Sequence, residues 1–184
     1  MANSIAASTR AYLDSLDVTV REAAEAAVRA NSVRVSGLEL SLEEELNLAK
    51  AVKFVAGADG VSVEELTALK FLMIMASIPN ELQKHVVDHE AVGGTLDDVG
   101  RLFPPASHKA AYVLSGATTV AAVDGLSAEE ETKARQLGAG FGLETALCDA
   151  LIAHARAMGL AMSRGDRELV EELERLRVVL LSRV

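Results

Sequence analysis

The chain has 184 residues, a length typical of a single domain with one hydrophobic core. Half of the residues are hydrophobic but only 3% are aromatic, so Ala, Leu and Val must build most of the interior, which favours packed helices over a sheet. There are 18 Lys and Arg residues against 27 Asp and Glu residues, the formal net charge is −9, and no basic cluster occurs. Because phosphate contacts carry much of the affinity for nucleic acid, we expect no direct binding to nucleic acid.

The N-terminal sequence MANSIAASTRAYLDSLD lacks a basic segment followed by an apolar run, and the most hydrophobic segment, FLMIMASIP at residues 71–79, is too short to span a bilayer. We therefore expect a cytoplasmic protein without direct membrane insertion. The single cysteine, Cys148, permits neither an internal disulfide nor an all-thiolate metal site. Its apolar neighbours predict a buried structural thiol.

The N-terminal part of the chain carries two Ala-rich helical patterns, at residues 4–16 and 19–30. Residues 32–40, SVRVSGLEL, are the one stretch in which apolar and polar residues alternate at the strand period, and Gly37 lies inside it. We expect a loop or a short extended connector there. Residues 1–40 are predicted to form a helical extension that precedes the core.

The predicted core, residues 41–160, opens with SLEE at residues 41–44. This is a capping box, in which a serine and a glutamate three residues later satisfy each other's backbone N–H groups, and it predicts a helix that ends near Ala58. A second box, SVEE at residues 62–65, predicts a helix over residues 63–78. Because this helix is apolar on nearly every face in its latter half, we expect it at the centre of the core.

The chain continues with helical patterns to its end. Pro79 is suited to open the helix of residues 80–89, and a short helix is expected at residues 95–103. Residues 106–123 predict a long helix, followed by a second acidic corner and further helices. Residues 161–184 predict an amphipathic C-terminal helix with leucines at heptad-like spacing, which either docks on the core or pairs with a partner.

Two acidic corners repeat along the chain with an offset of 65 residues. The sequence DGVSVEE begins at Asp59 and DGLSAEE begins at Asp124, and the match continues without a gap through Leu82 and Leu147. The repeated unit is a helix, a D-G-x-S-x-E-E corner and two further helices. We expect the two units to pack around one core with approximate two-fold symmetry.

These corners resemble those of the tellurite-resistance TerB family, in which two related halves each carry an Ala-rich helix, a D-G turn, Ser or Thr, and paired acids that open the next helix. The resemblance covers residues 41–159. It implies an all-α, single-domain TerB-like helical bundle of two pseudo-symmetric half-repeats, and a bacterial stress-response or scaffold protein that acts through protein partners. The residues it carries over as candidate ligands for a divalent metal are Asp59, Glu64, Glu65, Asp124, Glu129 and Glu130.

Elementary chemistry leaves two interpretations of each corner open. In the first, the corner is a hinge, because the glycine takes the turn, the serine caps the helix and the last glutamate completes the capping box without any ligand. In the second, a carboxylate such as Asp59, the exposed carbonyls of the preceding helix and a glutamate of the next helix form an all-oxygen shell for Ca²⁺ or Mg²⁺. Against the second, the N-terminus of a helix repels cations.

The sequence contains no G-x-S-x-G elbow, no P-loop and no pair of E-x-x-H motifs, so we expect no enzymatic activity. The small residues of QLGAGFG, residues 136–142, and the leucine row near the C-terminus both favour self-association, so we expect a homodimer. One alternative function is a metal-free helical oligomerisation or adaptor module acting through protein partners. A carboxylate-metal hydrolase or oxidase is a further alternative, which requires His or acidic ligands that converge in a cleft.

Overall fold

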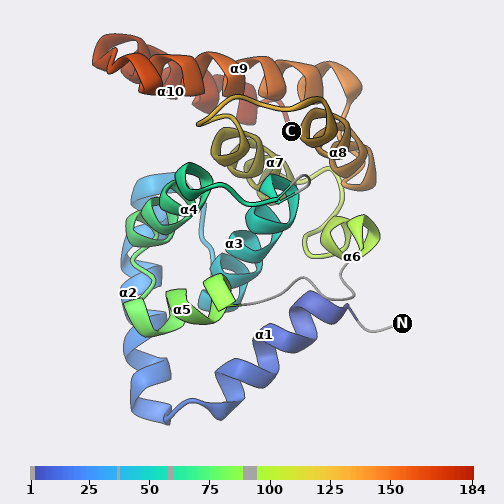
Figure 1. Cartoon of the computed structure of the whole chain (residues 1–184). Helices are drawn as coiled ribbons and strands as arrows, with labels where there is room; N and C mark the ends of the chain where they lie inside the picture. Colours follow the sequence, from blue (N-terminus) through green and yellow to red (C-terminus); the bar gives the residue numbers. More distant parts are fainter. Residues whose placement is uncertain (1–2, 37, 58–59, 89–94) are drawn as a thin grey trace.

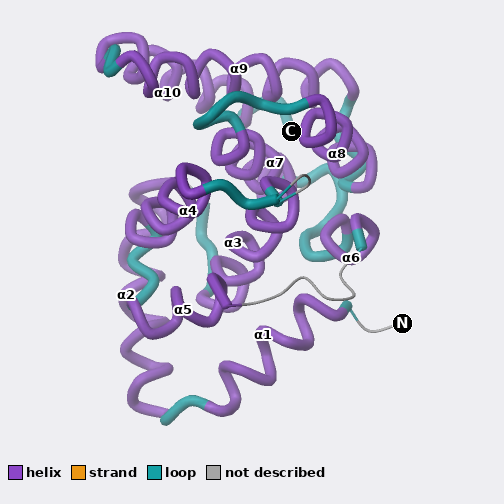
Figure 2. Tube along the Cα trace, in the orientation of Figure 1, coloured by secondary structure: helices purple, strands orange, loops and turns teal. Residues whose placement is uncertain are grey.

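The computed structural model of the chain describes residues 3–36, 38–57, 60–88 and 95–184. Within these ranges all regular structure is helical, which confirms the predicted all-α class (Figures 1 and 2). In chain order the helices are α1 (Ser4–Ser15), α2 (Val18–Ser36), α3 (Leu42–Ala56), α4 (Val63–Met75), α5 (Asn80–Asp88), α6 (Leu96–Gly100), α7 (His108–Ala121), α8 (Ala128–Gly140), α9 (Thr145–Arg164) and α10 (Arg167–Leu181).

Helices α3 and α7 form the centre of the bundle (Figure 1). They pack along each other, and most side chains of both helices are buried. Leu46 and Val52 of α3 and Leu114 and Ala117 of α7 are fully buried in one hydrophobic core. The remaining helices surround this pair: α1, α2 and α4 contact α3, and α8 and α9 contact α7.

The bounds of the helices recur with the offset seen in the sequence. Helix α8, Ala128–Gly140, has the bounds of α4, Val63–Met75, shifted by 65 residues. Helix α9 starts at the position that corresponds to the start of α5 in the same register. The capping boxes predicted at the starts of α3, α4 and α8 are all present.

Two predictions about the first half of the chain differ from the structure. Of the predicted connector at residues 32–40, residues 38–40 are non-helical as expected, but residues 32–36 belong to helix α2, which overrides the alternating pattern there. Helix α4 lies at the edge of the bundle, where Leu69 and Met73 are buried but Phe71 and Ile74 are 59% and 57% exposed. Because α4 is apolar on nearly all faces, its pattern does not indicate which face the core covers.

Two glycines of the segment 136–142 pack closely against other helices of the chain. A Cβ at Gly138 would overlap the sulfur of Cys148, and Gly140 lies against the backbone of Gly100. Gly138 and Gly140 therefore allow α9 and α6 to approach α8 closely, whereas Gln136, Ala139 and Gly142 are exposed, and the role of this segment in self-association stays a prediction. Cys148 is buried, as its apolar neighbours predict.

The C-terminal helix docks on the rest of the chain, in agreement with one of its two predicted roles. Helix α10 packs along α9, where Leu173 is buried against Met158 and Ala161 (Figure 1). Leu169 and Leu176 of the same leucine row remain exposed. At the other end of the chain, α1 packs on α3 and α6, so the N-terminal extension contacts the core directly.

Candidate functional site

The two acidic corners connect α3 to α4 and α7 to α8. Gly60 and Gly125 have φ angles of 113° and 111°, a backbone conformation that residues with a Cβ rarely adopt. A Cβ at either position would have open space around it, so the turn itself requires the glycine. Asp59, the first predicted ligand, lies outside the described residues.

Each corner orients a glutamate through a capping box. The Ser62 hydroxyl accepts a hydrogen bond from the Glu65 N–H at 3.1 Å, and the Ser62 N–H donates to Oε2 of Glu65 at 2.7 Å. At the second corner the corresponding distances between Ser127 and Glu130 are 3.2 and 2.8 Å. The local sequence therefore fixes one carboxylate oxygen of each glutamate at the start of its helix.

The two capping glutamates are buried and lie next to each other in the fold. Glu65 and Glu130 are each 2% exposed. Burial raises the pKa of Glu65 to about 7, and the adjacent carboxyl of Glu130 and the charge of Asp124 also raise it. Oε1 of Glu65 is buried and has no hydrogen-bond donor among the described residues. A proton shared between the two carboxyl groups would provide the donor that Oε1 of Glu65 lacks, whereas two ionised carboxylates have no proton between them.

The six residues predicted as metal ligands thus have different environments. Glu65 and Glu130 come together in the interior, and Asp124 is exposed at the second corner with its charge acting on Glu65. Glu64 and Glu129 are exposed. Within residues 3–36, 38–57, 60–88 and 95–184, no three or more His, Cys, Asp or Glu side chains converge to hold a metal ion. The described carboxylates therefore provide a buried pair, and a metal there would need further oxygen ligands.

A lysine that the sequence did not indicate binds at the end of α3, next to the first acidic corner. Lys133 of α8 donates a hydrogen bond at 2.6 Å to the carbonyl of Phe54, in the last turn of α3, and its ammonium lies 4.2 Å from the centre of the Phe54 ring. The prediction of a metal shell relied on free carbonyls at this end of α3. A cationic side chain already binds one of them, as expected at the negative end of a helix.

Glu44 has the same local motif in a different environment. It completes the capping box of Ser41 at the start of α3, but its side chain is 30% exposed and forms an ion pair with Lys109 at 2.6 Å. Although partial burial acts in the opposite direction, the hydrogen bond from Lys109 holds the pKa of Glu44 below its usual value. Among the capping glutamates of α3, α4 and α8, only Glu65 and Glu130 are buried against each other, so this environment does not follow from the capping box.

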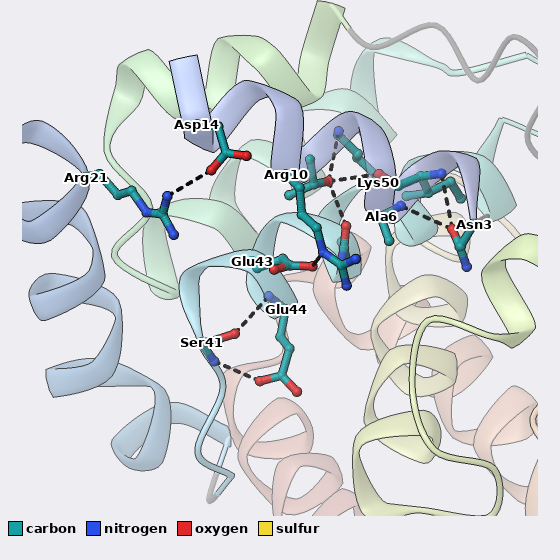
Figure 3. A network of polar contacts seen from close by, with 12 residues as sticks. Asn3, Ala6, Arg10, Asp14, Arg21, Ser41, Glu43, Glu44 and Lys50 are labelled. Carbon is teal, nitrogen blue, oxygen red and sulfur yellow. Dashed lines mark hydrogen bonds and ion pairs between the residues drawn. The ribbon is translucent and has the colours of Figure 1, made fainter. Parts of the chain in front are cut away.

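A second polar cluster, between α1 and α3, was also not indicated by the sequence (Figure 3). Lys50 is 2% exposed, and its ammonium donates to the hydroxyls of Ser8 at 3.2 Å and Thr9 at 3.0 Å. Thr9 in turn donates to Oδ1 of Asn47 at 2.6 Å. A helical pattern gives the position of Lys50 on α3 but not the packing of α1 over it.

Comparisons with protein-family models, with curated proteins and with solved structures find no match to this chain. Among the described residues, no helix has both the length and the apolar character needed to cross a membrane. Two environments of the fold are candidates for function, the buried carboxyl pair and the polar cluster beneath α1. Both contain buried ionisable groups with shifted pKa values, a property common at functional sites.

Proposed function

We propose that this chain is a non-enzymatic, TerB-like scaffold protein of a bacterial stress response that binds a divalent cation at its paired acidic corners. The observation that carries the proposal is the burial of two glutamates from equivalent positions of the repeat, with Oε1 of Glu65 lacking a donor from the part of the chain that the structure describes. The family part rests on the paired D-G-x-S-x-E-E corners, and the recurrence of helix bounds after 65 residues supports a bundle of two half-repeats.

The buried pair suits a hard cation for three reasons. Carboxylate oxygens are the ligands that Ca²⁺ and Mg²⁺ prefer. A cation between the two groups would remove the repulsion between two buried negative charges, which is otherwise costly in the interior. The capping boxes already hold Oε2 of Glu65 and of Glu130, so the carboxylates are oriented before any ion binds. Asp124 and water would complete the shell, because both ions take six or more oxygen ligands.

The test is calorimetric titration of chelator-treated protein with Ca²⁺, Mg²⁺, Mn²⁺ and Zn²⁺. We expect one ion per chain for the unmodified protein and loss of binding in Glu65→Gln and Glu130→Gln, which keep the shape of the side chain and remove its charge. Glu44→Gln is the matched control, because it changes a capping glutamate of the same type away from the pair. Absence of heat with every ion, in protein shown to be folded by circular dichroism, would refute the metal part of the proposal.

The alternative is a metal-free helical oligomerisation or adaptor module, and the outer face of α4 favours it. Phe71, Ile74 and Met75 are 59%, 57% and 44% exposed on consecutive turns. Exposed apolar side chains gathered on one helix are typical of a contact surface, and we take the second copy in a homodimer as its occupant. Light scattering should give a dimer mass for the unmodified chain and a monomer mass for Phe71→Glu. Monomeric protein at all concentrations would exclude the homodimer.

A further inference from the structure

A polar cavity of about 590 Å³ lies between α1, the start of α3 and the end of α6. Its volume is in the range of small-molecule sites. Charged and amide side chains from all three segments line it, namely Asn3, Arg10, Glu43, Glu44, Asn47 and Arg101. Figure 3 shows part of this lining, with Arg10 directed from α1 towards Glu43 and the capping box of Ser41 and Glu44 beside them.

Asn47 forms the base of the cavity and holds an unused donor. Asn47 is 5% exposed, and its Oδ1 accepts the hydrogen bond from the Thr9 hydroxyl at 2.6 Å. The Thr9 hydroxyl also lies 3.1 Å from the carbonyl of Ile5, but its contact with Asn47 is the shorter one. A separation of 2.6 Å is typical of an O–H···O bond and short for an N–H···O bond, so Oδ1, and not Nδ2, faces the hydroxyl. The Nδ2 group of Asn47 has no partner among the described residues, and Asn47 lines the cavity.

The carboxylates around the cavity already have partners. Glu43 accepts from Nε of Arg10 at 2.8 Å, and Glu44 accepts from Lys109 and from the backbone N–H of Ser41. Each of these bonds uses an acceptor of the lining. The donors are used only in part: Arg10 binds through Nε, and Arg101 binds Asp97 and Asp98 through one terminal nitrogen. A guanidinium carries five N–H donors, so both arginines keep donors for a ligand.

Lys50, which contacts the same Thr9 hydroxyl as Asn47, is a buried positive charge that forms no ion pair with a carboxylate of the described residues. The two hydrogen bonds of the Lys50 ammonium go to the neutral hydroxyls of Ser8 and Thr9. Burial lowers the pKa of Lys50 to about 8, so the group is still protonated at pH 7. An uncompensated cation in the interior is costly, and its field favours a negative charge in the adjacent cavity.

We propose that this cavity binds a small oxyanion, a carboxylate or a phosphate, held by Asn47 at the base and by Arg10 and Arg101 at the rim. The ligand would supply acceptor oxygens to the unused N–H groups of Asn47, Arg10 and Arg101, and a negative charge in the neighbourhood of the Lys50 ammonium. This inference is independent of the proposed cation site, because it involves neither acidic corner. It also gives the N-terminal helix a role, since α1 provides Arg10 and the hydroxyl that orients Asn47.

The probes are inorganic phosphate and succinate, titrated separately into the 184-residue chain while the backbone amide resonance of residue 47, which the variants also have, is followed by NMR. We expect a saturable shift of that resonance, and the stronger of the two probes identifies the preferred oxyanion. Asn47→Asp removes the donor but keeps an acceptor for Thr9, and we expect it to weaken binding about tenfold or more, the value of a hydrogen bond to a charged group. Arg101→Gln should weaken binding without affecting the interior, because this side chain is 52% exposed.

Arg21→Gln is the matched control. Arg21 is an exposed, ion-paired arginine on α2 that does not line the cavity, so its loss should leave affinity within about twofold. Absence of a saturable shift with both probes would overturn the proposal. So would binding that persists unchanged in Asn47→Asp and Arg101→Gln, because the anion would then lie elsewhere. Neither result would affect the cation experiment, whose variants are at other residues.

Discussion

Replacing Lys50 with methionine should stabilise the protein at neutral pH. The lysine is 2% exposed, and burial lowers its pKa from 10.5 to about 8. Keeping the buried group protonated at pH 7 therefore costs at most about 3 kcal/mol. Methionine has a similar volume and no charge, but it leaves the buried hydroxyl of Thr9 without one donor, which costs about 1 kcal/mol. We expect a net gain of about 2 kcal/mol in the free energy of unfolding.

The pH dependence provides the sharper test of this reasoning. The unfolded chain holds the Lys50 proton up to its pKa of 10.5, whereas the folded chain releases it near pH 8. The penalty is thus fully present below pH 8, and the unmodified protein gains stability as pH rises from 8 towards 10.5. Urea unfolding at pH 7, 8, 9 and 10 should show the advantage of Lys50→Met shrinking over this range. A variant that is less stable at pH 7, by a difference that does not change with pH, would refute the buried charge as the cause.

Three further outcomes follow from buried groups. In metal-free buffer at pH 8, Glu65→Gln should raise stability by about 2 kcal/mol because it removes one of two buried charges, whereas Glu44→Gln should lower it; thermal unfolding distinguishes these signs. Burial raises the pKa of Glu45 from 4.5 to about 7, so the contribution of Glu45 to the free energy of unfolding falls as pH rises from 4.5 to 7. Over that interval the urea-unfolding midpoint of Glu45→Gln should change less with pH than that of the unmodified protein. Gly159→Ala places a Cβ onto the backbone carbonyl of Ala122 and should lower the free energy of unfolding by about 3 kcal/mol in the same urea assay. A decrease of less than about 1 kcal/mol would contradict this close contact.

Local signals predicted the helix starts better than they predicted what each helix buries. The serine and glutamate of a capping box are three residues apart, so the start of α3 and of α4 could be read from the sequence and is observed. The environment of α4 could not be predicted, because the latter half of the helix is apolar on nearly every face and no face is marked as the one that the core covers. The cavity beneath α1 was missed for a related reason, since it depends on how α1 packs on α3.

The offset of the repeat pointed to Glu65 and Glu130 as equivalent residues, but their meeting in the interior is a property of the tertiary structure. Glu44 shows the difference, because an identical capping box leaves its carboxylate half-exposed and paired with a lysine. A hinge needs one oxygen of the glutamate to bind the serine N–H, and Glu44 meets that need without burial. The buried pair adds repulsion and an oxygen without a donor, neither of which a hinge requires. The comparison of Glu65→Gln with Glu44→Gln is therefore the measurement that separates a binding site from a turn.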